Sequence, residues 1–317
     1  MVTIPFALVA IKLLVDDITI FDVQKKVDIA KTAKPEEQSK LYSEAQLALE
    51  SLISGDKLKS GSDFRTAAAL FEVPNRFFEG VRVRYELNLT ALRLDDAVAR
   101  KSLPAVWDEL VISLGRNQRF GFGNDSKISY PGLYRVISAP KGVTQFWRDA
   151  EASVRRAKSS KDSKEIEAIM AADQKARDQD WSKLKPKDFE LIAKGDAQRL
   201  AQIKKLVAKG NLTTAADYFN AALVCQHGGE FDDYALAHEL SVISMILGAK
   251  SGSWLAAASY DRMLLNMGHR QRFGTQYYMV GGKTLLSPID ETMMNETQRF
   301  TVGRRKLSEI RAKGYGG

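Results

Sequence analysis

The sequence predicts a mainly α-helical protein that arose by tandem duplication. A small helical bundle with an appended β-hairpin occurs twice, and the first copy is degenerate. The tetrapeptide Gln-Arg-Phe-Gly is found at residues 118–121 and again at residues 271–274. The same gapless offset aligns further positions, most of them apolar or glycine: Ala68-Ala69-Leu70 with Ala221-Ala222-Leu223, Phe78 with Phe231, Glu86-Leu87 with Glu239-Leu240, Asp108 with Asp261 and Gly115 with Gly268. Such a repeat indicates one structural unit that is present twice.

The two copies differ in their polar residues. The second copy carries Gln226-His227, Asp261-Arg262 and Gly274-Thr275-Gln276, where the first has Val73-Pro74, Asp108-Glu109 and Gly121-Phe122-Gly123. The two copies share their apolar and glycine positions, but only the second has these polar residues. The sequence therefore predicts a single site in the second copy.

The linker between the copies is rich in serine and lysine and covers residues 158–164. Such composition is typical of a boundary, so we expect an N-terminal copy at residues 1–157 and a C-terminal copy at residues 165–317. A chain of 317 residues is long enough for two domains of ordinary size.

The first apolar segment runs from Ile4 to Val15 and contains Lys12. It is too short to span a bilayer, and it lacks the basic region and cleavage site of a secretory signal. We therefore expect a strand or short helix packed on the first domain. A cytoplasmic location is favoured, with a trimmed export signal as the alternative.

Both copies are expected to be mainly helical, and each ends in a hairpin. In the first copy the hairpin is expected at residues 120–130, and a helix follows at residues 144–156. In the second copy, helical spacing and stop signals predict helices over residues 165–181, 196–208, 214–227, 233–247, 253–268 and 291–313. Thr214 and Asp217 form an expected capping box, and Gly281-Gly282 is the turn of a hairpin between residues 276–280 and 283–286.

The composition is that of an ordinary globular protein, with 44% hydrophobic and 27% charged residues. The net charge of +8 is partly concentrated in the stretch between Arg155 and Lys161, and no basic run is interleaved with aromatic residues. A solvated linker explains this charge better than nucleic-acid binding does.

The residue types that bind metals or act as nucleophiles are sparse. The single Cys225 excludes an intrachain disulfide and a multi-cysteine zinc site, and its apolar helical surroundings indicate a core residue. The three histidines show no two-His zinc spacing, and no phosphate-binding glycine loop or Gly-x-Ser-x-Gly motif is present. We expect neither a metal nor another cofactor.

The candidate site residues all lie in the second copy. They are Asp173, Arg177, Gln226, His227, Asp261, Arg262, Gln276 and Arg299. Their order along the chain, together with Gln271, Gly274, Thr275, Asp290, Val302 and Gly303, resembles an uncharacterised bacterial domain-of-unknown-function family. The resemblance covers about residues 165–307 and implies a shared domain, not an activity.

Histidine is the natural acid/base residue, so we expect His227 to be catalytic, with Asp261 orienting it or acting beside it. Arg262 or Arg299 would bind a carboxylate, a phosphate or a developing oxyanion. The other candidates would contact the substrate. A structural role is the alternative for Asp261, because Asp108 persists in the first copy. It is favoured for Gln271, because its whole tetrapeptide persists.

Three hypotheses of function follow. The first is a metal-independent hydrolase- or lyase-type enzyme acting on a small polar or peptide-like substrate. The second is a non-catalytic module that binds a ligand or peptide in the same pocket. The third is a structural or interaction protein in which the first copy forms the partner surface. The oligomeric state is not predicted.

Overall fold

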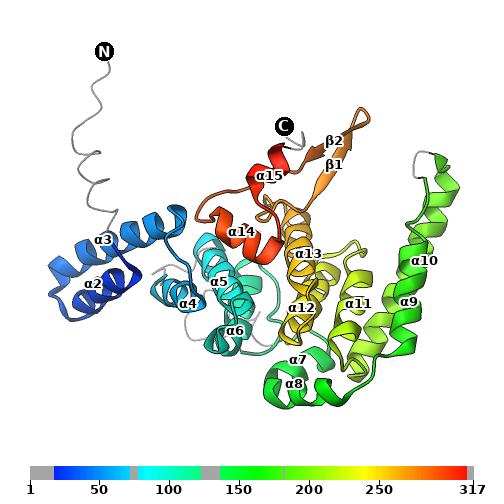
Figure 1. The fold of residues 1–317 in the computed structure, drawn as a ribbon, viewed down its shortest axis with the longest axis horizontal. Coiled ribbons are helices and arrows are strands. Elements are labelled where there is room, and N and C mark those ends of the chain that lie inside the picture. The colour runs from blue at the N-terminus through cyan, green and yellow to red at the C-terminus, as the bar shows by residue number, and fades with distance from the viewer. Residues whose placement is uncertain (1–17, 72–77, 123–135, 181–182, 313–317) are drawn as a thin grey trace.

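The computed structural model describes residues 18–71, 78–122, 136–180 and 183–312, and it is mainly α-helical (Figure 1). In the N-terminal half the helices are α2 (Ile20–Thr32), α3 (Pro35–Ser54), α4 (Gly61–Leu70), α5 (Phe78–Arg93) and α6 (Ala97–Ser113). The middle of the chain forms α7 (Lys141–Arg148), α8 (Ala150–Ser159), α9 (Lys164–Lys175) and α10 (Pro186–Lys209). The C-terminal part forms α11 (Ala215–Cys225), α12 (Phe231–Ile246), α13 (Gly252–Asn266), β1 (Tyr277–Val280), β2 (Lys283–Leu286), α14 (Glu296–Gly303) and α15 (Leu307–Ala312).

Local sequence signals start and stop several of these helices as predicted. The capping box of Thr214 and Asp217 begins α11, and a matching box of Ser60 and Asp63 begins α4. Gly210 ends α10 in the left-handed conformation. Gly281 and Gly282 both have positive φ between β1 and β2, which pair antiparallel as a two-residue hairpin requires.

Other helix boundaries differ from the prediction. The expected helix at residues 144–156 is two helices, α7 and α8, because the backbone of Asp149 leaves the helical region (φ −138°, ψ 56°). The expected C-terminal helix is also two, since Arg304 is left-handed after α14. Ser251, not Ser253, precedes α13. The apolar segment at residues 4–15 and most of the predicted first hairpin lie outside the described residues.

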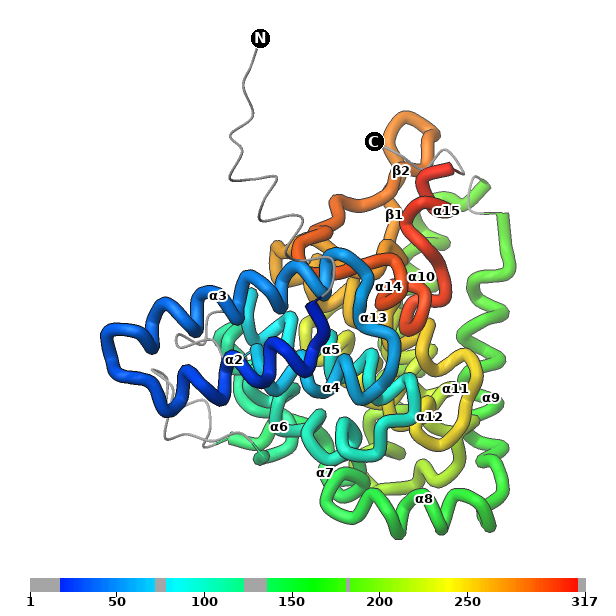
Figure 2. Tube along the Cα trace, turned by 60° about the vertical axis from the view of Figure 1, so that its left-hand side comes forward, coloured from blue at the N-terminus to red at the C-terminus, as the bar shows by residue number. Residues whose placement is uncertain are grey.

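The helices α4–α6 with the turn at residues 118–122 form what we call the first unit. The helices α11–α13 with the turn at residues 271–276 form the second unit. The two units pack against each other, so that α5 and α6 lie beside α12 and α13 at the centre of the molecule (Figure 1). The hairpin of α2 and α3 lies on one side and the pair α9 and α10 on the opposite side (Figure 2). The buried hydrophobic residues of both units form one continuous core.

Two buried ion pairs cross this centre, and each joins a glutamate of one unit to an arginine of the other. Glu86 of α5 binds Arg272 of the second unit at 2.8 Å, and Glu239 of α12 binds Arg119 of the first unit at 2.5 Å. Both glutamates and both arginines are buried. Since the sequence repeat aligns Glu86 with Glu239, and Arg119 with Arg272, the same contact occurs twice in opposite directions. Each unit therefore supplies the glutamate of one buried ion pair and the arginine of the other.

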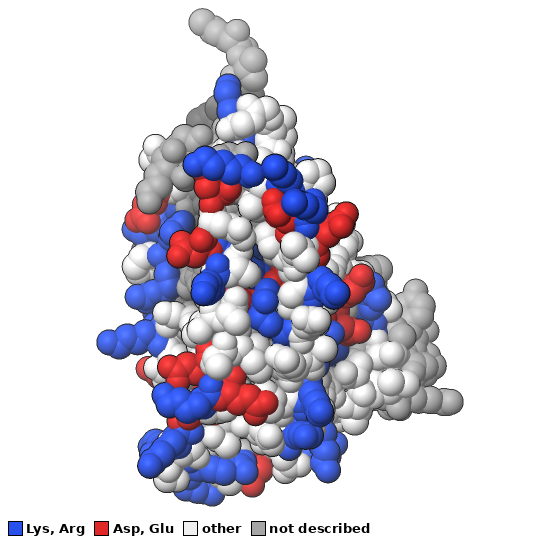
Figure 3. Space-filling view, turned by 90° about the vertical axis from the view of Figure 1, so that its right-hand side faces the viewer, with Lys and Arg blue, Asp and Glu red and all other residues white. Residues whose placement is uncertain are grey.

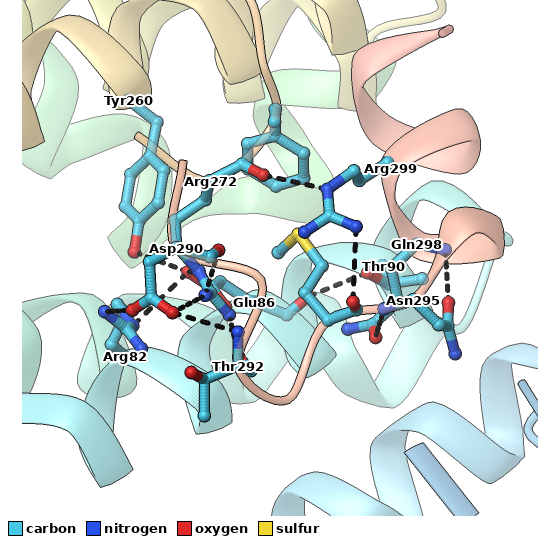
Figure 4. A network of polar contacts seen from close by, with 12 residues as sticks. Arg82, Glu86, Thr90, Tyr260, Arg272, Asp290, Thr292, Asn295, Gln298 and Arg299 are labelled. Carbon is cyan, nitrogen blue, oxygen red and sulfur yellow. Dashed lines mark hydrogen bonds and ion pairs between the residues drawn. The ribbon is translucent and has the colours of Figure 1, made fainter. Parts of the chain in front are cut away.

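Aromatic residues complete this centre. Trp107 donates its indole N–H to Glu239 at 3.0 Å, and Tyr260, which the repeat aligns with Trp107, donates its hydroxyl to Glu86 at 3.3 Å (Figure 4). Tyr85 and His238 are also aligned by the repeat, and they form a hydrogen bond with each other. His238 donates from Nδ1 to the carbonyl oxygen of Ala256, so its Nε2 accepts from the Tyr85 hydroxyl.

Candidate functional site

His227 follows the last turn of α11 and forms a dyad with Asp173 of α9. The His227 Nδ1 atom lies 2.9 Å from the Asp173 carboxylate, which is fully buried, while the histidine side chain is 16% exposed. A carboxylate only accepts hydrogen bonds, so Nδ1 carries the proton and, in the neutral ring, Nε2 has the free lone pair. In the dyad, the Nε2 atom of the partly exposed His227 ring is thus the proton acceptor, and Nδ1 is bonded to the buried Asp173 carboxylate.

Two arginines and a glutamine fix the Asp173 carboxylate. Arg177 donates to it at 3.1 Å, the Nε atom of Arg199 lies 3.4 Å from it, and the Gln174 amide donates at 3.0 Å. Burial raises the pKa of Asp173, but the hydrogen bond from His227 and the nearby positive charges outweigh it, so the pKa lies below its ordinary value. Asp173 is therefore an anion at neutral pH.

Asp196 and Arg199 of α10 are site residues that the sequence reasoning missed. Asp196 accepts from Arg177 at 3.0 Å and from Arg199 at 2.5 Å, so both arginines bridge Asp173 and Asp196. The signal that could have found them is the spacing of Asp196 and Arg199, three residues apart on α10, which resembles the four-residue spacing of Asp173 and Arg177.

Arg262 of α13 lies next to this cluster. Its charge interacts with Arg177 and with the Tyr234 hydroxyl of α12. Asn266, one helical turn further on the same face of α13, donates to the carbonyl oxygen of Gly229 at 3.2 Å. This bond holds the Arg262 face of α13 against the loop that starts at His227.

The other predicted residues lie in the turn after α13. Asp261 is buried and accepts hydrogen bonds from the backbone N–H groups of Arg272, Phe273 and Thr275, at 2.7, 3.0 and 3.1 Å. Burial raises its pKa, and these bonds act in the opposite direction without reversing the shift. Asp108 accepts from the N–H groups of Arg119, Phe120 and Phe122 in the same way. The contacts of Asp261 are those of a turn residue, and the carboxylate that contacts His227 is Asp173.

Gln271 and Gln276 belong to the same turn. The Gln271 side chain donates to the carbonyl oxygens of Gln276 and Ser287 and accepts from the Gln276 N–H, which joins the turn to the end of β2. Gln276 donates its own amide to the carbonyl oxygen of Ala258 at 3.2 Å. The predicted structural role of Gln271 agrees with these contacts.

Arg299 and Gln226 are also buried. Arg299 of α14 donates to the carbonyl oxygens of Arg272 and Met294 (Figure 4), and Gln226 is the C-cap of α11. Figure 4 also shows Asp290, which pairs with Arg82 at 2.7 Å and with Arg272 at 3.3 Å. The structure thus brings His227, Asp173 and Arg177 together through direct contacts, with Arg262 in electrostatic interaction with Arg177, and it places Asp261 and Gln276 in the turn after α13, where Arg299 binds the carbonyl oxygen of Arg272.

Other kinds of site find little support in the described part of the chain. It contains no group of three His, Cys, Asp or Glu side chains placed to hold a metal ion. Cys225 is buried, and burial raises the pKa of its thiol. On the face formed by α9 and α10, Lys and Arg alternate with Asp and Glu and form no continuous basic surface (Figure 3). Among the described helices, none combines the length and apolar character needed to cross a bilayer.

Comparison with known proteins gave no relative. No family model matches the chain, and searches of curated proteins and of solved structures found no significant match.

Proposed function

We propose that the C-terminal part of the chain, from α9 to α14, is a hydrolase- or lyase-type enzyme that acts on a small polar substrate, with His227 as its general base. The observation that carries this proposal is the 2.9 Å contact between His227 and the buried Asp173. This contact orients the imidazole ring of His227 and leaves its Nε2 atom to accept a proton.

In this reaction the Nε2 atom of His227 removes a proton from water or from the substrate. The positive charge that then develops on the ring is stabilised by Asp173, which also holds the ring in the correct tautomer. Arg177 and Arg199 keep Asp173 ionised and fixed. The proton leaves Nε2 for the leaving group in the second half of the reaction, which returns His227 to its neutral form.

We further propose that the two units arose by duplication and that the first is a degenerate copy. The exchanged ion pairs and the matching roles of Asp108 and Asp261 support this origin. At the position that the repeat aligns with Arg262, the first unit has Glu109, which is paired with Arg84 at 2.9 Å. Pro74, which the repeat aligns with His227, lies outside the described residues.

A binding module without catalysis is the second candidate. It is favoured by an open hollow at the C-terminal end of α9, lined by the polar or charged residues Gln174, Lys175, Arg177 and Asp178, of which Arg177 is only partly exposed. An open polar surface suits recognition, whereas catalysis is helped by the exclusion of water.

The experiment measures turnover of a panel of small esters, anilides and amides between pH 5 and 9. If the proposal holds, His227→Gln lowers kcat/KM of an accepted substrate by about 10²- to 10⁴-fold, the usual contribution of a general base. The matched control is His269→Gln, since His269 stacks on Phe78 away from the dyad. Turnover that survives in His227→Gln refutes the proposal, and binding of a panel compound without turnover supports the second candidate.

A further inference from the structure

Arg262 is a charged side chain that lacks a partner. Its Nε atom is fully shielded from solvent, and the guanidinium has no hydrogen bond or ion pair with any residue in the described ranges. Burial lowers the pKa of this guanidinium and the charge of Arg177 acts in the same direction, with Tyr234 opposing them. The side chain as a whole is partly exposed, and a partly buried cation near a second cation gains from a bound anion.

The arginines of the Asp173 cluster are paired with carboxylates. Arg177 and Arg199 each bind both Asp173 and Asp196. The nearby Asp233 is paired with Lys204. Arg262 differs from Arg177 and Arg199 in having no carboxylate partner among the described residues.

In the first unit, the residue that the repeat aligns with Arg262 is paired within the unit. Glu109, which the repeat aligns with Arg262, forms an ion pair with Arg84 of α5. The repeat aligns Arg84 with Ala237, so in the second unit both members of this pair are replaced. Where the first unit has an internal ion pair, the second unit has a single cation.

We infer that Arg262, supported by Arg177, forms an anion-binding site for a carboxylate, and that this carboxylate belongs to the ligand of the second unit. A guanidinium binds a carboxylate through two parallel hydrogen bonds, and a carboxylate would give Arg262 the kind of partner that Arg177 and Arg199 already have. The inference rests on the proposed function only in naming this group as part of the substrate of His227. The hydrogen bond between Asn266 and Gly229 joins the helix that carries Arg262 to the loop that follows His227.

The test uses the full chain and three probes at constant ionic strength: N-acetylglycine, its uncharged analogue N-acetylglycinamide, and inorganic phosphate. Binding is followed by the NMR signal of the Arg262 Nε–H group and by calorimetry. We expect saturable binding of N-acetylglycine only, weakened about 10- to 100-fold in Arg262→Met, as loss of a charged hydrogen bond implies. Arg100→Met is the matched control, because the Nε atom of Arg100 also has no partner in the described part of the first unit.

A second measurement separates a ligand site from a structural role. Without ligand, Arg262→Met should keep or raise the Tm, since it removes an unpaired charge, whereas Arg177→Met should lower it. The inference is overturned if N-acetylglycine does not bind, if it binds Arg262→Met equally well, if phosphate binds in its place, or if Arg262→Met lowers the Tm as Arg177→Met does. His227→Gln should retain N-acetylglycine binding. A chain that binds this probe but turns over no substrate would refute the proposed enzyme and leave the anion site in place.

Discussion

Replacing Glu239 by Gln should destabilise the protein strongly, because this carboxylate neutralises a buried arginine of the other unit. Its Oε1 atom accepts from Arg119 Nε at 2.5 Å and from Trp107 at 3.0 Å, and its Oε2 atom accepts from Arg119 at 3.1 Å. A glutamine has the same shape, but it turns one of these acceptors into a donor and removes the charge. Removing one member of a buried ion pair costs about 3–5 kcal/mol.

Asp232 provides the matched control on the same arginine. It contacts Arg119 at 2.8 Å, but its side chain is 70% exposed. An ion pair with an exposed member contributes about 0–1 kcal/mol, so Asp232→Asn should change the free energy of unfolding little. The equivalent variant Glu86→Gln should cost less than Glu239→Gln. Arg272 keeps Asp290, which is only 22% exposed, and two backbone carbonyl oxygens.

The assay is urea denaturation followed by circular dichroism, with the free energy of unfolding extrapolated to water. The expected order of destabilisation is Glu239→Gln, then Glu86→Gln, then Asp232→Asn. The reasoning is refuted if Glu239→Gln costs no more than Asp232→Asn, because the exchanged pairs would then not hold the two units together.

Three further outcomes follow from buried groups. Burial lowers the pKa of His238 to about 4, so the unfolded chain takes up the proton first as pH falls from 6.5 to 4. Stability should decline in this range by up to about 3 kcal/mol, and a His238→Gln variant should show a flatter pH dependence of the urea midpoint. Gln271→Ala should lower the free energy of unfolding by about 1–3 kcal/mol, since it leaves buried backbone groups unpaired; a variant that unfolds like the wild type but fails to bind ligand would assign Gln271 to the site instead. Cys225 should react with a thiol reagent such as DTNB only after unfolding, because burial raises the pKa of its thiol, and rapid modification of the native protein would contradict its placement in the core.

Local signals in the sequence determined much of the secondary structure. The capping box at Thr214, the stop at Gly210 and the turn at Gly281-Gly282 act through hydrogen bonds and backbone angles within a few residues. Such interactions need no knowledge of distant parts of the chain. The C-terminal helix was predicted too long because Arg304 adopts a left-handed conformation, which an arginine side chain does not predict.

The repeat also pointed to the central residues without assigning their partners. It aligned Glu86 with Glu239 and placed an arginine in both copies of the tetrapeptide. Whether each glutamate binds the arginine of its own unit or that of the other unit depends on how α5 and α12 pack. Only the tertiary structure shows that the pairs are exchanged.

The tertiary structure also decides which carboxylate binds His227 in the candidate site. From the sequence, Asp261 was expected to orient His227 or to act beside it, with a structural role as the alternative because Asp108 persists in the first copy. The structure instead places Asp173 of α9 against His227 and uses Asp261 to hold backbone N–H groups of the turn after α13. Residue types and spacings along one helix determine which side chains share a face, but the contact between α9 and α11 is set by the packing of apolar faces far apart in the chain. For that reason the sequence listed Asp173 only as a substrate contact, and only the fold shows it bound to His227.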